Sequence, residues 1–278
     1  MKHLFSVLFV VGLLLVSCGP KENGMNQKPF DGVAIVAHRG YWNCEEAGYA
    51  QNSIAALRCA QEAGCWGSEF DINMTSDEVL VVFHDGWADG KKFEDNPYSA
   101  FADVRLPNGE PIPTLDQYLE QAKKCAQTKL VFELKQHSTP AVEDRAVDLS
   151  VEKLKASGLF SPDRVMFISF SLHACRRFAE VAPGFSVQYL GSNITPAEVA
   201  DNGINGIDTN YGTIYGDESW VSEARERGMS VNIWTVDRDK DMTRVLGQKI
   251  DQLTTNEPLA ARAMLKQMGI TEVILGGK

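Results

Sequence analysis

The heptapeptide Trp66-Gly67-Ser68-Glu69-Phe70-Asp71-Ile72 holds two acids, two residues apart, in a mostly apolar run. Successive side chains of a β-strand face opposite ways, so Glu69 and Asp71 share one face of the predicted strand. A second apolar run, Leu130–Leu134, contains Glu133, and Lys135 follows two residues after that glutamate. Charged groups inside an apolar strand need partners, so the two runs predict one shared charged site.

Two further charged pairs accompany these runs: His38-Arg39 lies upstream, and His84-Asp85 lies between them. Carboxylate oxygens suit a hard cation such as Ca²⁺ or Mg²⁺. Histidines transfer protons near neutral pH because their ordinary pKa is about 6.5. An arginine fork and a lysine point charge bind phosphate oxygens. These residue types predict phosphoester chemistry at a site that binds one divalent cation.

Short apolar runs alternate with amphipathic segments along the chain. The predicted strands are Val33–Ala37, Trp66–Ile72, Val79–Phe83, Leu130–Leu134, Val165–Ser169, Ser186–Leu190, Gly206–Thr209, Ser230–Thr235 and Ile250–Thr254. The predicted helices are Ser53–Ala63, Thr114–Ala126, Ala141–Ala156, Ser171–Val181, Thr195–Asn202, Asp217–Arg227, Asp239–Leu246 and Glu257–Met268. Strands that alternate with helices indicate an α/β fold with a parallel sheet.

The length favours one large (β/α)8 barrel, a TIM barrel, because such barrels take about 250 residues. The predicted strands outnumber the eight places in this barrel by one. Val79–Phe83 is the extra strand, since residues 73–78 are too few for a crossover helix and suit a hairpin-like return. Gly86–Pro113 lacks periodicity and is predicted to be a lid-like insertion on the catalytic face.

The first thirty residues are predicted to precede the barrel. Residues 1–17 contain an apolar run too short to span a bilayer as a mature helix, which indicates a secretory signal peptide. Cys18 follows Leu15-Val16-Ser17, and this resembles the lipobox of bacterial lipoproteins, in which the cysteine is lipidated. Residues 18–30 are then the lipidated cysteine and its tether, and residues 31–278 form a single domain.

The lipobox resemblance implies an exported bacterial lipoprotein, held at a membrane through Cys18 on its periplasmic or cell-surface side. The alternative is a coincidental cysteine in an ordinary signal peptide or anchor. Six cysteines include Cys18, which leaves an odd number, and no Cys-x-x-Cys pair occurs. This spacing argues against zinc and leaves at least one thiol unpaired within the chain.

The formal net charge of −10 bears on the partners of the protein. Affinity for a phosphate backbone needs clustered lysine and arginine, so the charge argues against a nucleic-acid partner. No obligate protein partner is indicated. The predicted partners are therefore a small anionic substrate and a membrane.

The order of the charged residues resembles the glycerophosphodiester phosphodiesterase family. The motifs that carry the resemblance are Ala37-His38-Arg39-Gly40, Gln51-Asn52-Ser53, Gly67–Asp71 with Thr75 and Asp77, Val81–Asp85, Glu133-Leu134-Lys135, Asn232–Val236 and Thr255–Pro258. The resemblance extends over about residues 33 to 265. It implies a (β/α)8 barrel with its site at the C-terminal ends of the strands.

The resemblance also implies an activity, the metal-dependent hydrolysis of small glycerophosphodiesters to sn-glycerol 3-phosphate and an alcohol. The implied roles are metal ligand for Glu69, Asp71 and Glu133, acid–base catalyst for His38 and His84, and phosphate binding for Arg39 and Lys135. Trp234 is a candidate wall of the substrate pocket. Attack by water and attack by a glycerol hydroxyl through a cyclic phosphate both remain open.

Several assignments have structural alternatives. Glu133 and Lys135 also suit an ion pair at a strand end, His84 a structural histidine with satisfied hydrogen bonds, and Trp234 core packing. His137 is predicted to be a solvated loop residue. Other functions open to the same barrel are a phospholipase or sphingomyelinase-D-like lipid phosphodiesterase and a lipoprotein that binds a phosphoester without cleaving it.

The chain departs from the family at Gln51, where a glutamate is usual. An amide supplies neither the charge nor the basicity of a carboxylate. Any supporting role of that glutamate is therefore lost or changed in this chain, while the three predicted metal ligands are intact.

Overall fold

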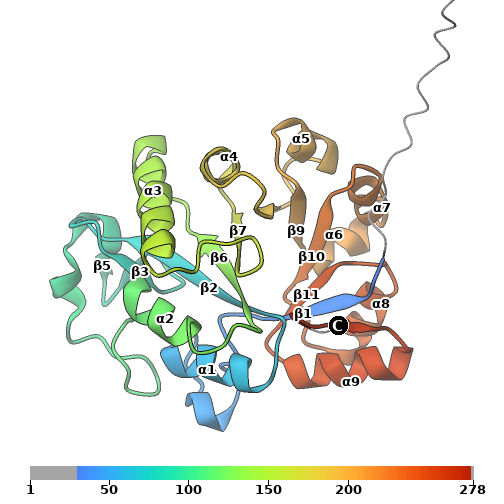
Figure 1. The fold of residues 1–278 in the computed structure, drawn as a ribbon, viewed down its shortest axis with the longest axis horizontal. Coiled ribbons are helices and arrows are strands. Elements are labelled where there is room, and N and C mark those ends of the chain that lie inside the picture. Colours follow the sequence, from blue (N-terminus) through green and yellow to red (C-terminus); the bar gives the residue numbers. More distant parts are fainter. Residues whose placement is uncertain (1–29, 277–278) are drawn as a thin grey trace, which may run out of the picture.

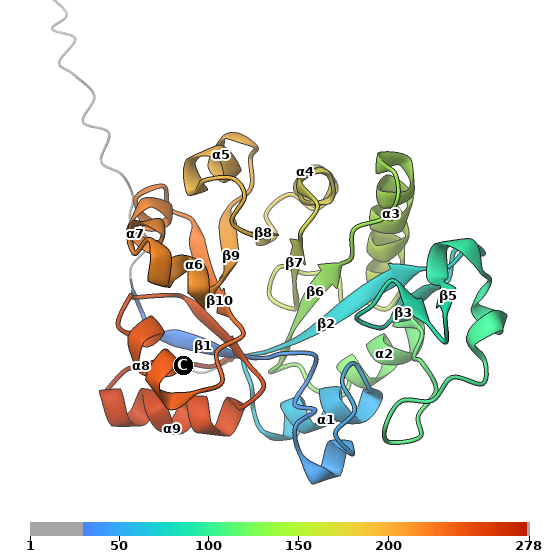
Figure 2. The same cartoon turned by 180° about the vertical axis from the view of Figure 1, so that it is seen from behind.

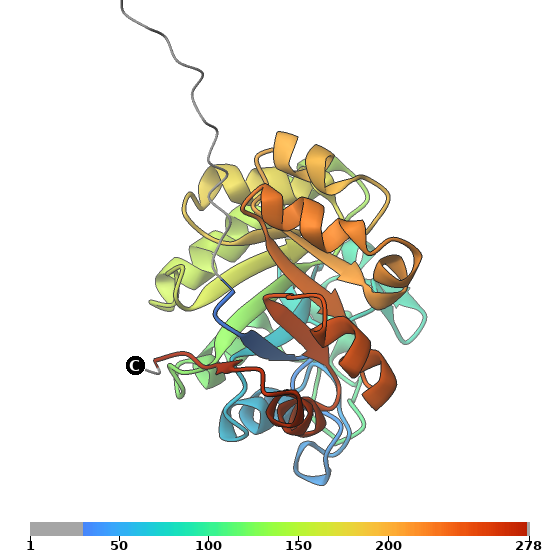
Figure 3. The same ribbon diagram turned by 90° about the vertical axis from the view of Figure 1, so that its right-hand side faces the viewer.

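The computed structural model of the protein describes residues 30–276, and within them eight parallel strands close into a barrel (Figures 1 and 2). In order around the barrel these are β1 (Val33–Ala37), β2 (Gly67–Met74), β6 (Lys129–Leu134), β7 (Val165–Ser169), β8 (Val187–Leu190), β9 (Gly206–Asn210), β10 (Ser230–Trp234) and β11 (Gln252–Thr255). The barrel closes because β1 pairs in parallel with both β11 and β2. Figure 3 shows β1 in blue beside the orange-red C-terminal strands. The predicted (β/α)8 fold is confirmed.

Helices surround the barrel between successive strands. They are α1 (Ile54–Glu62), α2 (Leu115–Ala122), α3 (Pro140–Ala156), α4 (Leu172–Val181), α5 (Pro196–Asp201), α6 (Tyr211–Gly216), α7 (Ser219–Glu226), α8 (Asp239–Leu246) and α9 (Pro258–Met268). Hydroxyls of the preceding residue accept backbone N–H groups and fix the start of α1 through α5, at Ser53, Thr114, Thr139, Ser171 and Thr195. The prediction missed α6 and extended the helix after Thr114 beyond its end at Ala122.

The strand β3 (Leu80–Val82) returns antiparallel to β2 outside the barrel, so the prediction of an extra strand is confirmed. After β3 come the β4–β5 hairpin (Trp87–Ala88 and Lys91–Lys92) and the short 3₁₀ helices η2 (Phe93–Asp95) and η3 (Tyr98–Phe101). This region has a small apolar core of its own, which includes Phe93, Phe101 and Ile112. Two further short elements are η1 (Glu45–Ala47) and β12 (Glu272–Val273), which extends the sheet beside β1.

The alternation of β2 separates its packing face from its charged face. Phe70 points outward and stacks on Tyr118 of α2 with ring centroids 4.4 Å apart. On β6, Phe132 likewise packs outward against Phe178 of α4. The intervening residues, Glu69 of β2 among them, face the barrel interior and are buried there. The apolar core thus lies between the sheet and the helices, and the charged side chains lie inside the barrel.

No helix within residues 30–276 is long and apolar enough to cross a bilayer. The predicted signal peptide, the lipidated Cys18 and the tether up to residue 29 lie outside the described residues. The described cysteines, Cys44, Cys59, Cys65, Cys125 and Cys175, are all free thiols.

Candidate active site

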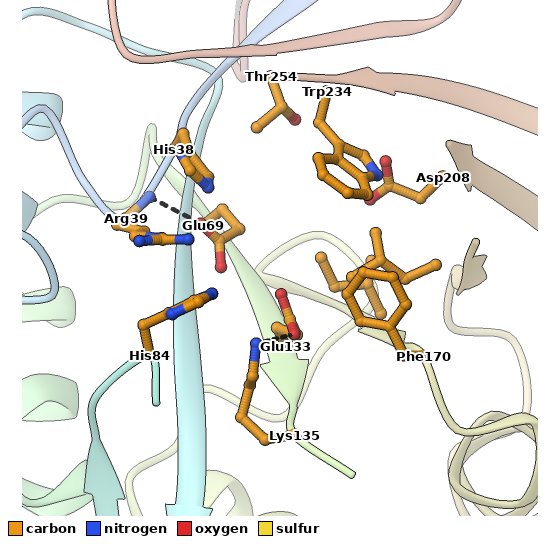
Figure 4. A pocket seen from close by; sticks show the side chains of 12 residues that line it. His38, Arg39, Glu69, His84, Glu133, Lys135, Phe170, Asp208, Trp234 and Thr254 are labelled. Carbon is orange, nitrogen blue, oxygen red and sulfur yellow. Dashed lines mark hydrogen bonds and ion pairs between the residues drawn. The ribbon is translucent and has the colours of Figure 1, made fainter. Parts of the chain in front are cut away.

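A pocket lies at the C-terminal ends of the barrel strands (Figure 4). It is lined by His38, Arg39, Glu69, His84, Glu133, Lys135, Ile168, Phe170, Leu190, Asp208, Trp234 and Thr254. Every residue predicted from the sequence to act at the site is in this set except Asp71, and Asp71 contacts Lys135 directly at 3.2 Å. The structure therefore brings the predicted residues together from strands that are far apart in the sequence.

Three buried carboxylates, those of Glu69, Asp71 and Glu133, offer oxygens that lie within 4.8 Å of one another. The parallel register of β2 and β6 places Asp71 beside Glu133. Oxygen Oε2 of Glu69 accepts the backbone N–H of Arg39 at 2.7 Å, whereas the buried Oε1 has no hydrogen-bond partner among the described residues. A buried carboxylate oxygen without a partner fits a cation ligand, so the triad suits a divalent metal.

The pKa values of the triad reflect burial and mutual repulsion. Burial and the neighbouring Asp71 raise the pKa of Glu69 well above its ordinary value and that of Glu133 to about 7. Burial acts in the same direction on Asp71, but Lys135, His84 and Arg39 outweigh it and lower the pKa of Asp71 to about 2. The cluster thus holds one firmly ionised acid and two acids that favour a proton or a cation.

The ammonium of Lys135 lies between two of these acids. Its Nζ donates to Glu133 Oε1 at 2.6 Å and to Asp71 Oδ1 at 3.2 Å. Burial opposes the charge, but the two carboxylates prevail and raise the pKa of Lys135 above its ordinary value. The ion pair considered as an alternative for Glu133 and Lys135 therefore exists, and it lies inside the pocket.

His38 is held in one tautomer by a chain of hydrogen bonds. Its Nδ1 lies 2.9 Å from Asn256 Oδ1, which also accepts from Trp42 Nε1 at 2.8 Å. The Asn256 amide Nδ2 in turn donates to Asp237 Oδ2 at 2.7 Å. Because the Asn256 oxygen is the acceptor, Nδ1 of His38 carries the proton and Nε2 is free to accept one. Burial and the charge of Arg39 lower the pKa of His38 to about 4.

His84 lies at the rim of the pocket and is partly exposed. Its Nδ1 lies 2.8 Å from Asp85 Oδ1. Burial lowers the pKa of His84, while Asp71 and the contact with Asp85 act in the opposite direction. The neighbouring carboxylate stabilises the protonated form of this ring when His84 gains a proton.

The turn after β1 aims Arg39 into the pocket. Arg39 and Gly40 both have positive φ, 55° and 77°. A side chain at position 40 would come within 2.7 Å of Ala56, so this close approach requires glycine. The guanidinium Nη1 of Arg39 donates to Gln51 Oε1 at 2.6 Å. Gln51 thus holds the Arg39 side chain by accepting a hydrogen bond. Because its amide is neutral, it compensates the positive charge of Arg39 less than a glutamate at this position would.

Asn52 braces the metal-ligand candidate Asp71. Its Nδ2 donates to Asp71 Oδ2 at 2.8 Å, and its Oδ1 accepts the backbone N–H of Asp71 at 3.1 Å. The adjacent Ser53 caps α1.

The region 86–113 lies beside the pocket. None of its residues lines the pocket within the described part of the chain, but Leu106 and Pro107 border a neighbouring hollow that reaches Arg39 and His84. A role as a lid stays a prediction.

The prediction for His137 was wrong. His137 is 8% exposed, and its Nε2 accepts the backbone N–H of Met74 at 3.2 Å. The chain turns after β6 across the end of β2, and the ring satisfies a backbone group there.

Sequence reasoning gave no role to Asn256, Asp237 or Asp208. Asn256 and Asp237 support His38, and Asp208 lines the pocket. The apolar run around Asp208 held a signal, because an acid inside a strand calls for a partner. Asn256 lies 218 residues from His38, and no local pattern connects the two.

A (β/α)8 barrel whose central pocket combines buried carboxylates, two histidines and two cations defines a phosphoester-cleaving barrel enzyme. The match to known families narrows this class. Residues 38–260 match the glycerophosphoryl diester phosphodiesterase family, and the chain belongs to this family. It is therefore a phosphodiesterase, as the resemblance of its motifs implied.

Known proteins resemble the chain over most of its length. A crystal structure of a glycerophosphodiester phosphodiesterase from Parabacteroides distasonis is 40% identical, with a TM-score of 0.82 over 86% of this chain and 99% of that one. A glycerophosphodiester phosphodiesterase from Bacillus subtilis is 27% identical over 92% of this chain and 96% of its own length. An Oleispira antarctica phosphodiesterase, solved in complex with the product sn-glycerol-3-phosphate, shares the fold at 20% identity and a TM-score of 0.72, over 84% and 97% of the two chains.

Proposed function

We propose that the protein hydrolyses glycerophosphodiesters to sn-glycerol 3-phosphate and an alcohol, with one divalent cation and the histidines His38 and His84. The observation that carries this proposal is the convergence of Glu69, Glu133, both histidines and both cations in one pocket, with Asp71 completing the triad through its contact with Lys135. The names of the relatives and the product bound to the Oleispira antarctica phosphodiesterase support the choice of substrate.

Glu69, Asp71 and Glu133 would hold the cation, and their all-oxygen donor set suits Ca²⁺ or Mg²⁺. When bound, the cation neutralises charge on a nonbridging phosphate oxygen. The side chains of Arg39 and Lys135 line the same pocket and bind the remaining phosphate oxygens. Lys135 approaches the phosphate as a point charge, and Arg39 as a fork held by Gln51.

His38 is the base of the proposed reaction. Its Nδ1 proton is committed to Asn256, so Nε2 takes the proton of the attacking hydroxyl or water. A low pKa keeps His38 neutral, and therefore able to accept, at neutral pH. His84 donates a proton to the departing alcohol at the rim, and Asp85 stabilises its protonated form.

The test is release of glycerol 3-phosphate from a panel of glycerophosphodiesters, measured after chelation and after addition of Ca²⁺ or Mg²⁺. Wild-type protein is expected to be active only with metal. His38→Ala is expected to lower kcat by about 100-fold or more, the usual contribution of a general base. His173→Ala is the matched control, because His173 is an exposed histidine of α4 paired with Asp144.

Two outcomes would count against the proposal. Metal-independent release would remove the role of the triad. Release from intact lipids alone would favour the lipid phosphodiesterase that the sequence left open.

We also propose that the protein is an exported lipoprotein held at a membrane through Cys18. The support is the apolar leader and the Leu15-Val16-Ser17-Cys18 pattern. In a bacterial host, Cys18→Ala is expected to abolish incorporation of labelled fatty acid and to move the protein out of the membrane fraction. Equal labelling of both proteins would refute the assignment.

A further inference from the structure

One wall of the pocket is not used by the proposed chemistry. Asp208 and Trp234 lie there on the neighbouring strands β9 and β10, across the pocket from the two histidines (Figure 4). The parallel register pairs Asp208 with Asn232, and Trp234 follows two positions later on the same face. The two side chains therefore lie diagonally adjacent and face the barrel interior.

Each of these side chains has a buried polar atom without a partner among residues 30–276. Asp208 is 1% exposed, and its Oδ1 has no hydrogen bond. Nε1 of Trp234 is also buried and unpaired. Figure 4 shows the indole nitrogen turned toward the carboxyl group of Asp208. Buried polar groups in proteins are nearly always paired, so two neighbouring exceptions in a substrate pocket indicate a ligand.

The rest of the wall holds this pair in place. Asn232, which pairs with Asp208 in the register of β9 and β10, donates from Nδ2 to Thr254 Oγ1 at 2.8 Å. Phe170 packs edge-on against Trp234 with ring centroids 5.8 Å apart. Burial raises the pKa of Asp208 well above its ordinary value. The two unpaired atoms thus belong to a supported wall of the pocket.

The chemistry of the two atoms selects the ligand group. Oδ1 of Asp208 accepts a hydrogen bond, whereas Nε1 of Trp234 only donates one. An ammonium group has donors only and would leave the indole N–H unpaired. A hydroxyl donates and accepts, so a single hydroxyl satisfies both atoms.

We propose that Asp208 and Trp234 form a hydroxyl-binding subsite that selects the terminal hydroxyl of the glyceryl group. This inference rests on the proposed function, because Arg39 and Lys135 draw the phosphate to the opposite side of the pocket. The glyceryl group then extends from the phosphate to the wall formed by β9 and β10. Asp208 is a specificity residue in this arrangement and takes no part in proton transfer.

The test compares two diesters with the same alcohol, one of glycerol and one of propane-1,2-diol, which lacks only the terminal hydroxyl. Wild-type protein is expected to prefer the glycerol diester in kcat/KM by about 10- to 100-fold, the effect of losing a hydrogen bond to a buried polar group. Asp208→Ala and Trp234→Phe are each expected to remove most of this preference. Asp208→Asn keeps an oxygen acceptor and is expected to retain more of the preference than Asp208→Ala.

Ile168→Val is the matched control, because Ile168 lines the same pocket but offers no side-chain hydrogen bond and no aromatic ring to contact Trp234. It is expected to lower kcat/KM for both diesters by a similar factor and to keep their ratio. Equal wild-type activity on the two diesters would overturn the subsite, as would an Asp208→Ala variant that lowers both rates and keeps the ratio.

A binding measurement separates this inference from the proposed function. Calorimetry compares sn-glycerol 3-phosphate with the 1-phosphate of propane-1,2-diol on the metal-loaded wild-type protein and the Asp208→Ala variant. If neither diester is hydrolysed but wild type prefers glycerol phosphate and Asp208→Ala does not, the proposed function fails and the subsite stands. Hydrolysis without any such preference in rate or binding leaves the proposed function intact and refutes the subsite.

Discussion

Asn256 determines which nitrogen of His38 can accept a proton. Its Oδ1 lies 2.9 Å from Nδ1 of His38. The carboxylate of Asp237 holds Asn256 in place, because it accepts hydrogen bonds from both the side-chain Nδ2 and the backbone N–H of Asn256. We predict that Asn256→Ala lowers kcat by about 10- to 100-fold, because a freed ring is displaced or changes tautomer. KM is expected to change little, since Arg39 and Lys135 still bind the phosphate. Steady-state kinetics and ¹⁵N NMR of the ring report the two effects.

Trp42→Phe provides the control for this prediction. Trp42 Nε1 donates to the same oxygen of Asn256 but makes no hydrogen bond to the ring of His38. It is expected to lower kcat far less than Asn256→Ala does. An Asn256→Ala variant with wild-type kcat and an unchanged tautomer would show that the ring is positioned by other contacts.

At the scale of one element, the outward face of β2 packs in the apolar core, and its inward face bears candidate metal ligands. Phe70 is fully buried against Tyr118 and Phe132, so Phe70→Ala is expected to lower the free energy of unfolding by about 3–5 kcal/mol. The side chain one position earlier, Glu69, is expected to behave differently. In chelator at neutral pH, Glu69→Gln is expected to be at least as stable as wild type, because it removes a buried acid whose Oε1 lacks a partner.

Denaturant unfolding with and without Ca²⁺ or Mg²⁺ separates these two effects. The Phe70→Ala protein is expected to gain stability from the metal as wild type does, and the Glu69→Gln protein to gain little. A Glu69→Gln protein that the metal stabilises fully would argue against Glu69 as a ligand.

The same strand shows how far sequence reasoning reaches. The period of two along residues 66–72 predicted both the strand and the shared face of Glu69 and Asp71, because alternation is a local property. The short spacing before β3 predicted its antiparallel return, and the predicted helices that became α1, α2, α4 and α5 begin at their hydroxyl caps. The helix that became α3 was predicted to begin at Ala141, two residues after its cap Thr139.

Asn256 lies in a motif of the family resemblance and Asp208 in an apolar run, but no local pattern predicts that Asn256 contacts His38 or that Asp208 lines the pocket. Their roles depend on barrel closure, which brings distant strands to one pocket, and the burial of His137 likewise depends on a tertiary turn.

For the whole molecule, the buried triad couples stability to pH. The folded protein holds a proton on Glu133 up to about pH 7, whereas the unfolded chain releases it near the ordinary value of 4.5. The folded state thus binds more protons in this range, and the free energy of unfolding falls as pH rises through it. His38 acts in the opposite direction, since its pKa is lowered to about 4 from 6.5, but only below pH 6.5.

Above pH 6.5 the raised carboxyl pKa values of Glu133, Glu69 and Asp208 therefore dominate. We expect the Tm of the metal-free protein to fall between pH 6.5 and about pH 8, as calorimetry can measure. Ca²⁺ or Mg²⁺ replaces the protons, so its stabilising effect is expected to grow over the same range. Glu133→Gln is the control, because an amide does not titrate and the fall in Tm should become shallower. A wild-type Tm that rises over this range in chelator would mean that the triad is already ionised in the folded protein without a metal.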